Sequence, residues 1–264
     1  MSPGTSLRVA TYNVHACVGT DGRYDPERVA AVIAELDADI VAVQEFAYPV
    51  AVALETRQPV VFTALDRYEC ALGPTRQTVT HCFGNALLTR HPIGDVHRID
   101  LSTGRYEPRG ALAATVAVGD VPVHVLAAHL GLRVHERRFQ VRQILEYLDQ
   151  VRDTLLVVLG DFNDWLPGRS VVHVLDRRLG QPPRPASFPS RWPVVPLDRI
   201  WVDPAGAVRS IAAHASPLAR RASDHLPVVA AIDLAPPAAA RPVADREPLA
   251  RQVLAGSARR EVLR

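Results

Sequence analysis

Carboxylate, amide and imidazole side chains in this sequence occur beside short apolar segments that have the composition of β-strands. Asn13, Glu45, His129 and Asp161 follow such segments, whereas Asp198, Asp224 and His225 come shortly before others. The carboxyl end of a strand and the amino end of its antiparallel neighbour meet at the same edge of a sheet. We therefore expect these side chains to gather at one edge.

Carboxylates crowded at one edge repel one another, and a bound cation relieves that repulsion. Oxygen ligands with open positions for water and phosphate suit Mg²⁺, with Mn²⁺ as the alternative. The three cysteines, Cys17, Cys70 and Cys82, have no CxxC spacing, and no HxxxH pair occurs. This argues against zinc.

Each of these residues also has an ordinary structural explanation when taken alone. Asp161 could cap a helix, Asn13 could form an Asx-turn, and His129 could be a hydrogen-bonded structural histidine. Their occurrence together at strand ends favours a functional site.

The apolar pattern predicts strands that alternate with helices. Strands are expected at 7–12, 40–43, 86–88, 111–118, 121–128, 155–159, 200–202 and 227–232, and helices at 136–151 and 170–179. A further helix, with Pro26 in its first turn, precedes residue 40, because Val29, Val32, Ile33 and Leu36 have helical spacing. Hairpin-like neighbours mixed with strand–helix–strand passages predict mixed sheets with helices packed outside.

Length and composition are those of a folded α/β protein. The chain has 264 residues, 48% of them hydrophobic and 22% charged. We expect a domain over residues 1–235 and, over 236–264, an Ala-, Pro- and Arg-rich tail that is flexible or forms one short helix. The formal net charge of +2 gives no overall field typical of a nucleic-acid-binding protein. With no apolar run of about 20 residues and no basic-then-apolar amino terminus, we expect a cytoplasmic protein. We also expect it to be a monomer.

Seven short motifs, taken in order, resemble the endonuclease/exonuclease/phosphatase superfamily, and most closely its bacterial metal-dependent hydrolase branch. They include Asn13-Val14-His15, Gln44-Glu45, Gly84-Asn85-Ala86, His129-Leu130, Gly160-Asp161-Phe162-Asn163, Asp198-Arg199-Ile200 and Ser223-Asp224-His225, and the branch also carries a stretch like Phe188-Pro189-Ser190-Arg191. The resemblance covers about residues 7–234. It implies a four-layer αββα sandwich of two mixed β-sheets flanked by helices.

The resemblance also implies Mg²⁺-dependent hydrolysis of a phosphate ester by in-line attack of an activated water. By position, Glu45, Asn13 and Asp224 are the implied metal ligands, and Asn13, Asn85 and His15 the implied phosphate-binding residues. The implied catalytic residues are Asp161, which orients or deprotonates the water; His225, held by Asp198; Asn163, on a phosphate oxygen; and His129, on the leaving group. Abasic-site endonucleases carry an acid where His15 stands, which argues against an abasic-site endonuclease.

Two residues outside the motifs remain open to two interpretations. Arg109, next to Gly110 and before a strand, could contact phosphate or be a surface arginine in a turn. Trp165 could form an aromatic wall for the substrate or serve packing.

We expect the substrate to be a lipid headgroup or another small phosphodiester, which would allow peripheral contact with a membrane. A DNA nuclease is the alternative, for which Arg67, Arg76, Arg105 and Arg133 could supply part of a basic surface. A catalytically inactive binding module is the third hypothesis. It requires the loss of at least one key residue, and all the main ones are present.

Overall fold

A computed structural model describes residues 6–50, 65–152, 154–165 and 170–234 of the chain. The expected tail at 236–264 lies outside the described residues. None of the described helices is long and apolar enough to cross a lipid bilayer.

The described strands form two mixed sheets. A six-stranded sheet has the order β10-β11-β1-β2-β4-β3 and a five-stranded sheet the order β5-β6-β7-β8-β9. The strands are β1 Ser6–Asn13, β2 Ile40–Pro49, β3 Glu69–Gln77, β4 His81–Thr89, β5 Ile93–Asp100, β6 Gly110–Val118, β7 Val121–His129, β8 Leu155–Asp161, β9 Asp198–Asp203, β10 Val208–Ala213 and β11 Val228–Asp233. Within these sheets β1 pairs with β2 and β7 with β8 in parallel, and the other pairs are antiparallel.

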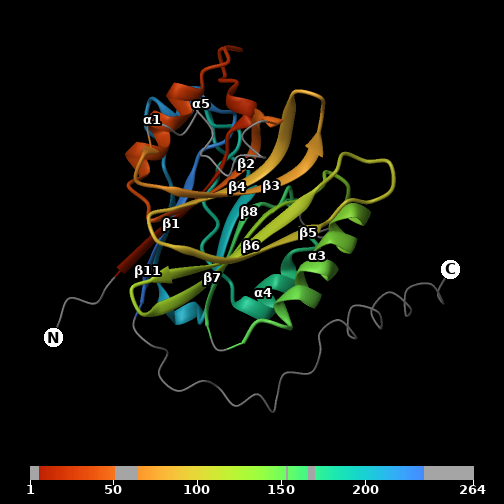
Figure 1. Ribbon diagram of the computed structural model, residues 1–264, viewed down its shortest axis with the longest axis vertical. Coiled ribbons are helices and arrows are strands. Elements are labelled where there is room, and N and C mark those ends of the chain that lie inside the picture. Colours follow the sequence, from red (N-terminus) through yellow and green to blue (C-terminus); the bar gives the residue numbers. More distant parts are fainter. Residues whose placement is uncertain (1–5, 51–64, 153, 166–169, 235–264) are drawn as a thin grey trace.

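Helices cover the outer face of each sheet, so the molecule has four layers (Figure 1). The helices are α1 Pro26–Leu36, α3 Val134–Leu148, α4 His173–Leu179 and α5 Ala219–Ala222, with short 3₁₀ turns η1 His15–Cys17 and η3 Ala205–Ala207. Helices α1 and α5 pack on the six-stranded sheet, and α3 and α4 pack on the five-stranded sheet. The αββα sandwich predicted from the sequence is confirmed.

Side-chain alternation explains why polar residues collect at one edge of the sandwich. Leu7 and Val9 of β1, Val123 to Ala127 of β7, and Val157 and Leu159 of β8 contribute alternate side chains to the core between the sheets. Because strand side chains alternate with a period of two, the inward positions that follow are Thr11 and Asn13 on β1, His129 on β7 and Asp161 on β8. These residues continue the inner apolar faces to the edge where the strands end.

A β-bulge in β2 adds Glu45 to this inner edge. Pairing with β4 shifts register between Val43 and Phe46, and Glu45 has a left-handed backbone with φ of 54°. The extra residue moves Phe46 into the outer core under α1. As a result, consecutive side chains bond to inner-face residues: Gln44 accepts from Thr11, and Glu45 accepts from Asn13.

The eight predicted strands and three predicted helices are all present, with differences at their ends. The helix predicted at 136–151 is Val134–Leu148, and the one predicted at 170–179 begins at His173. Strands β3, β5 and β10 were not predicted. All three are edge strands with few buried side chains, and they lack the apolar runs by which buried strands are found.

Gly160 lets the parallel strands β7 and β8 approach closely next to Asp161. Its φ is 148°, and a Cβ at this position would lie 1.9 Å from the carbonyl oxygen of Ala128. Only glycine fits a backbone this close to a neighbouring strand.

Gly160→Ala should therefore destabilise the fold by at least about 3 kcal/mol, because the clash is with backbone and the φ is unfavourable for alanine. Gly206→Ala is the matched control, since a Cβ at Gly206 meets nothing within 4 Å, and it should change stability by less than about 1 kcal/mol. Urea unfolding measures both. Equal midpoints for the two variants would contradict the close-approach explanation.

Candidate active site

Asp161 lies at the centre of the polar edge between the two sheets. Its carboxylate is buried, with the residue 1% exposed. Oδ2 accepts a hydrogen bond from Asn13 Nδ2 at 3.0 Å and lies 3.5 Å from His129 Nε2 and 3.9 Å from His225 Nε2. Oδ1 accepts from the backbone N–H of Asn163 at 3.0 Å. Side chains from three separate segments, together with one nearby backbone N–H, thus converge on one carboxylate.

Strand register produces this convergence. His129 of β7 pairs with Asp161 of β8, which in turn pairs with Asp198 at the start of β9. On the other sheet, Asn13 ends β1, and His225 lies just before β11. The prediction that carboxyl ends and amino ends of strands meet at one edge is confirmed for these residues.

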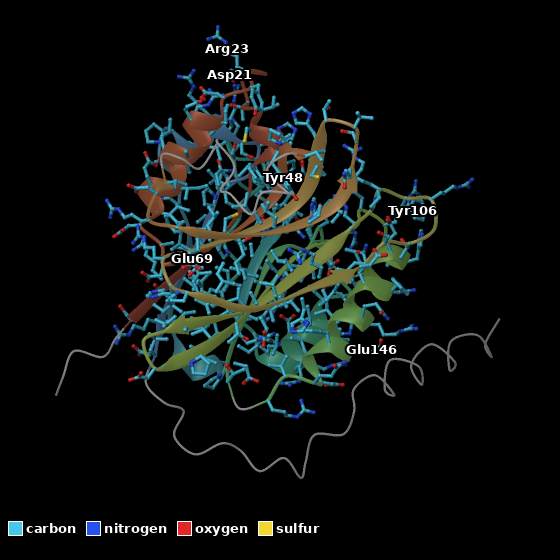
Figure 2. The ribbon with its side chains drawn as sticks, in the orientation of Figure 1. Asp21, Arg23, Tyr48, Glu69, Tyr106 and Glu146 are labelled. Carbon is cyan, nitrogen blue, oxygen red and sulfur yellow. The ribbon has the colours of Figure 1, made fainter. Side chains whose placement is uncertain are left out.

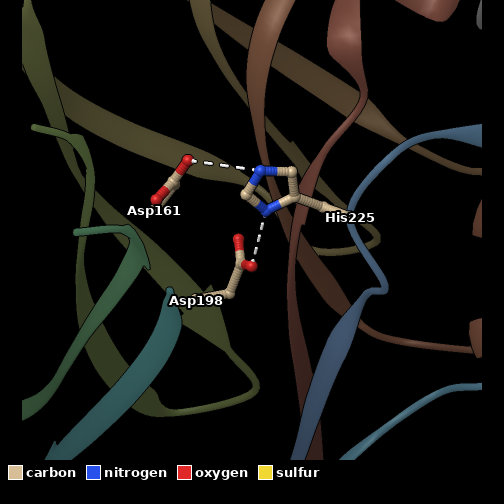
Figure 3. Close-up of side chains that lie close together, drawn as sticks. All are labelled: Asp161, Asp198 and His225. Carbon is tan, nitrogen blue, oxygen red and sulfur yellow. Dashed lines mark hydrogen bonds and ion pairs between the residues drawn. The ribbon is translucent and has the colours of Figure 1, made fainter. Parts of the chain in front are cut away.

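His225 and Asp198 form a buried ion pair (Figure 3). His225 Nδ1 donates to Asp198 Oδ2 at 2.8 Å, and the same oxygen accepts from Ser187 Oγ at 2.6 Å. Burial alone disfavours the charged ring, but the negative charges of Asp198 and Asp161 outweigh it and raise the pKa of His225 to about 10. The ring is therefore a cation at neutral pH.

His129 has the opposite electrostatic environment. Burial lowers its pKa; the Asp161 carboxylate opposes this, while the positive charges of Arg109 and His225 add to it, and the pKa falls to about 3. Arg109 Nη1 lies 3.2 Å from His129 Nδ1, and Arg109 Nη2 pairs with Glu107 Oε2 at 2.8 Å. His129 is therefore a neutral ring at neutral pH.

Glu45 and Asn13 lie on the partly open side of Asp161. Asn13 Nδ2 donates to Glu45 Oε1 at 3.0 Å. The pKa of Glu45 is raised above its ordinary value, mainly because the side chain is buried. The hydrogen bond from Asn13 lowers the pKa, whereas the negative charge of Asp161, and to a smaller extent that of Asp224, raises it. Asp224, with a side chain 37% exposed, lies 3.9 Å from His15 Nδ1. The partly exposed carboxylates of Glu45 and Asp224, with the amide oxygen of Asn13, are oxygen donors of the kind that a hard divalent cation prefers.

A second group of candidate ligands is less suitable for a metal. Single atoms of Asp161, Asp198 and His225 lie within 4.8 Å of one another. The proton shared between His225 Nδ1 and Asp198 already occupies the space between two of them, and a cationic ring repels a metal ion. We interpret this group as the His225–Asp198 hydrogen-bonded pair beside Asp161 and keep Glu45, Asn13 and Asp224 as the metal-ligand candidates.

The remaining predicted residues surround this centre in different ways. Asn163 has a φ of 49°, and its Nδ2 donates to the carbonyl of Leu130 at 2.9 Å. Asn85 donates to the carbonyl of Gly110 at 2.8 Å, which ties β4 to β6 across the sandwich. His15 is half-exposed, and its Nδ1 bonds the carbonyl of Val18 at 2.9 Å. Arg109 is only 7% exposed, which excludes the surface-turn interpretation.

Three supporting residues were not singled out from the sequence. Ser187 bonds Asp198, and Ser223 Oγ donates to the carbonyl of Asn13 at 2.8 Å. Asp164 accepts from the backbone N–H groups of Val171 and Val172 and so holds the residues directly before α4. Ser223 is the first residue of the Ser-Asp-His motif and Asp164 directly follows the Gly-Asp-Phe-Asn motif, whereas no signal in the sequence connects Ser187 to Asp198. Trp165 is 51% exposed and is not a core residue.

The chain was also compared with known proteins. The Endonuclease/Exonuclease/phosphatase family model matches residues 10–225. The Uncharacterized protein YbhP of Escherichia coli strain K12 is 35% identical over 164 residues, which are 57% of this chain and 63% of that protein. The chain therefore spans about 63% of the length of this relative.

Solved structures share the fold. An endonuclease/exonuclease/phosphatase from Beutenbergia cavernae DSM 12333 has a TM-score of 0.70 and 26% identity, covering 89% of this chain and 74% of that one. D. rerio TDP2 complexed with single strand DNA product has a TM-score of 0.64 and 18% identity, covering 87% of this chain and 99% of that one. At the latter identity the likeness concerns the fold alone.

The ion pair predicts how His225 titrates in the protein without added divalent metal. The folded-state pKa lies above that of an exposed histidine, about 6.5. The stabilising contribution of the pair is therefore complete below about pH 6.5 and is lost as the pH rises through about 10. Asp198→Asn should lower the pKa of His225, as measured by NMR titration of the ring.

Asp203→Asn, on the same strand β9 but bonded to Arg178, is the control and should leave the titration unchanged. If His225 titrates alike in the wild type and in Asp198→Asn, the ion pair does not set its charge.

Proposed function

The chain belongs to the endonuclease/exonuclease/phosphatase family, and from this we propose that it is a Mg²⁺-dependent phosphodiesterase. The reaction is hydrolysis by in-line attack of water on phosphorus. The observation that carries the proposal is the convergence of Asn13, His129 and His225 on Asp161, with Glu45 alongside.

The Asp161 carboxylate and the His225 imidazolium, both buried, suit two different steps of this reaction. Asp161 accepts the proton of the attacking water in this proposal, because its buried carboxylate lies at the centre of the site, close to Asn13, His129 and His225. Among the described residues, His225 Nε2 makes no hydrogen bond, and its distance to Asp161 Oδ2 is 3.9 Å. The imidazolium N–H is thus available for a phosphate oxygen as negative charge builds on the equatorial oxygens.

Two neutral donors complete the recognition of the phosphate. Asn163, held in its left-handed conformation beside Asp161, offers its side-chain amide to a phosphate oxygen. His129 faces the leaving-group side in this proposal. Glu45, Asn13 and Asp224 would hold Mg²⁺, which supplies neutralisation of the phosphate charge when it is bound.

We favour a small phosphodiester, such as a lipid headgroup, as the substrate. The formal net charge is only +2, which supports a compact substrate over a long polyanion. We expect a cytoplasmic monomer to carry out this reaction.

A nuclease is the second candidate, and it is favoured by exposed aromatic side chains outside the centre. The guanidinium of Arg133 lies 5.2 Å from the ring centre of Tyr106, which is exposed on the loop before β6 (Figure 2), and Trp165 is also exposed. Exposed aromatic rings with arginine suit bases and phosphates of single-stranded nucleic acid. Binding that weakens steeply with salt would support this candidate.

Metal removal tests the proposed chemistry. Hydrolysis of bis-p-nitrophenyl phosphate should stop in EDTA and return with Mg²⁺ or Mn²⁺, because the carboxylates alone repel the anionic ester. Glu45→Gln should weaken metal affinity, so its activity should partly recover at high metal concentration. Full activity in EDTA would refute the metal-dependent mechanism, and complete inactivity of the wild type with every metal would favour the inactive binding module.

A further inference from the structure

Arg109 is buried at the candidate active site, where its guanidinium contacts His129 and Glu107. Its Nη1 lies 3.2 Å from His129 Nδ1, and its Nη2 lies 2.8 Å from Glu107 Oε2. The backbone carbonyl of Arg109 accepts from the N–H of Leu101 at 2.9 Å. Main chain and side chain are therefore both fixed, and the guanidinium is directed at one nitrogen of His129.

This contact determines which nitrogen of His129 carries the proton. A guanidinium has five N–H donors and no acceptor, and it does not lose its proton in proteins. His129 Nδ1 must therefore accept, so the proton of the neutral ring is on Nε2.

The surroundings of Nε2 agree with that tautomer. Its nearby carboxylate oxygens are Asp161 Oδ2 at 3.5 Å and Glu45 Oε1 at 3.8 Å, and both are acceptors. Asn163 Nδ2 lies 3.3 Å away but has a better acceptor in the carbonyl of Leu130, at 2.9 Å. The Nε2–H thus points into the site.

We propose that Glu107 and Arg109 form a positioning pair that holds His129 in its Nε2–H tautomer, so that the ring presents a hydrogen-bond donor to the substrate. Arg109 acts through His129 and does not itself bind phosphate. The catalytic consequence rests on the proposed phosphodiesterase function, whereas the tautomer itself does not.

Substitution of His129 can distinguish a hydrogen-bond donor from a general acid at this position. A glutamine side chain offers the same pattern, with an oxygen to accept from Arg109 and an N–H₂ group to donate into the site. An alanine offers neither. Glutamine should therefore replace His129 in part, and only while Arg109 is present to orient its amide.

The direct test is ¹⁵N NMR of the histidine rings in the protein without metal or substrate. The wild type should show His129 with Nδ1 unprotonated and Nε2 protonated. Arg109→Met should abolish that single pattern, and Arg109→Lys should retain it, since a lysine also only donates. Arg90→Met is the matched control, because Arg90 is ion-paired with Asp37 away from this site and its loss should leave His129 unchanged.

Kinetics on bis-p-nitrophenyl phosphate with Mg²⁺ supply the second readout. Arg109→Met should lower kcat by about 10- to 100-fold, as for other partners that orient a catalytic histidine, with little change in KM. His129→Gln should be more active than His129→Ala, and this advantage should disappear in the Arg109→Met background.

Three results would overturn the proposal: a proton on Nδ1 of His129 in the wild type, an unchanged NMR pattern in Arg109→Met, or a loss that appears mainly in KM, which would mean that Arg109 binds phosphate. The NMR result does not depend on turnover. An inactive wild type with the expected tautomer would therefore refute the proposed function and leave the positioning pair intact.

Discussion

The site depends on a carboxylate that is taken out of water and surrounded by N–H groups. Asp161 can be buried because Asn13 and the backbone of Asn163 donate to its two oxygens, with His129 and His225 close by. An unpaired buried carboxylate would cost several kcal/mol. The close approach at Gly160 and the registry of β7, β8 and β9 therefore serve this one group.

The two histidines near Asp161 differ in charge, one cationic and one neutral, because each has a different second partner. His225 is paired with the negative Asp198, whereas His129 is paired with the positive Arg109. Titratable groups whose surroundings push their pKa values apart are suited to different roles. One ring is a fixed cation for developing negative charge, and the other is a neutral donor.

Much of this arrangement follows from the sequence, since inward alternation along β1, β7 and β8 leads to Asn13, His129 and Asp161. Local patterns do not encode the rest. Edge strands β3, β5 and β10 bury few side chains, and the bulge at Glu45 arises from pairing with β4. The contact of Arg109 with His129 joins the residue before β6 to the end of β7. Such features depend on tertiary contacts, which a single sequence does not display.

Single-turnover hydrolysis by Asp161→Asn tests the central claim most directly. The amide keeps the shape of the side chain but cannot take a proton from water. The account predicts that Mg²⁺ and a non-hydrolysable phosphodiester still bind as in the wild type, while the rate of hydrolysis falls by about 10²- to 10⁴-fold. Hydrolysis at the wild-type rate would contradict the role given to Asp161.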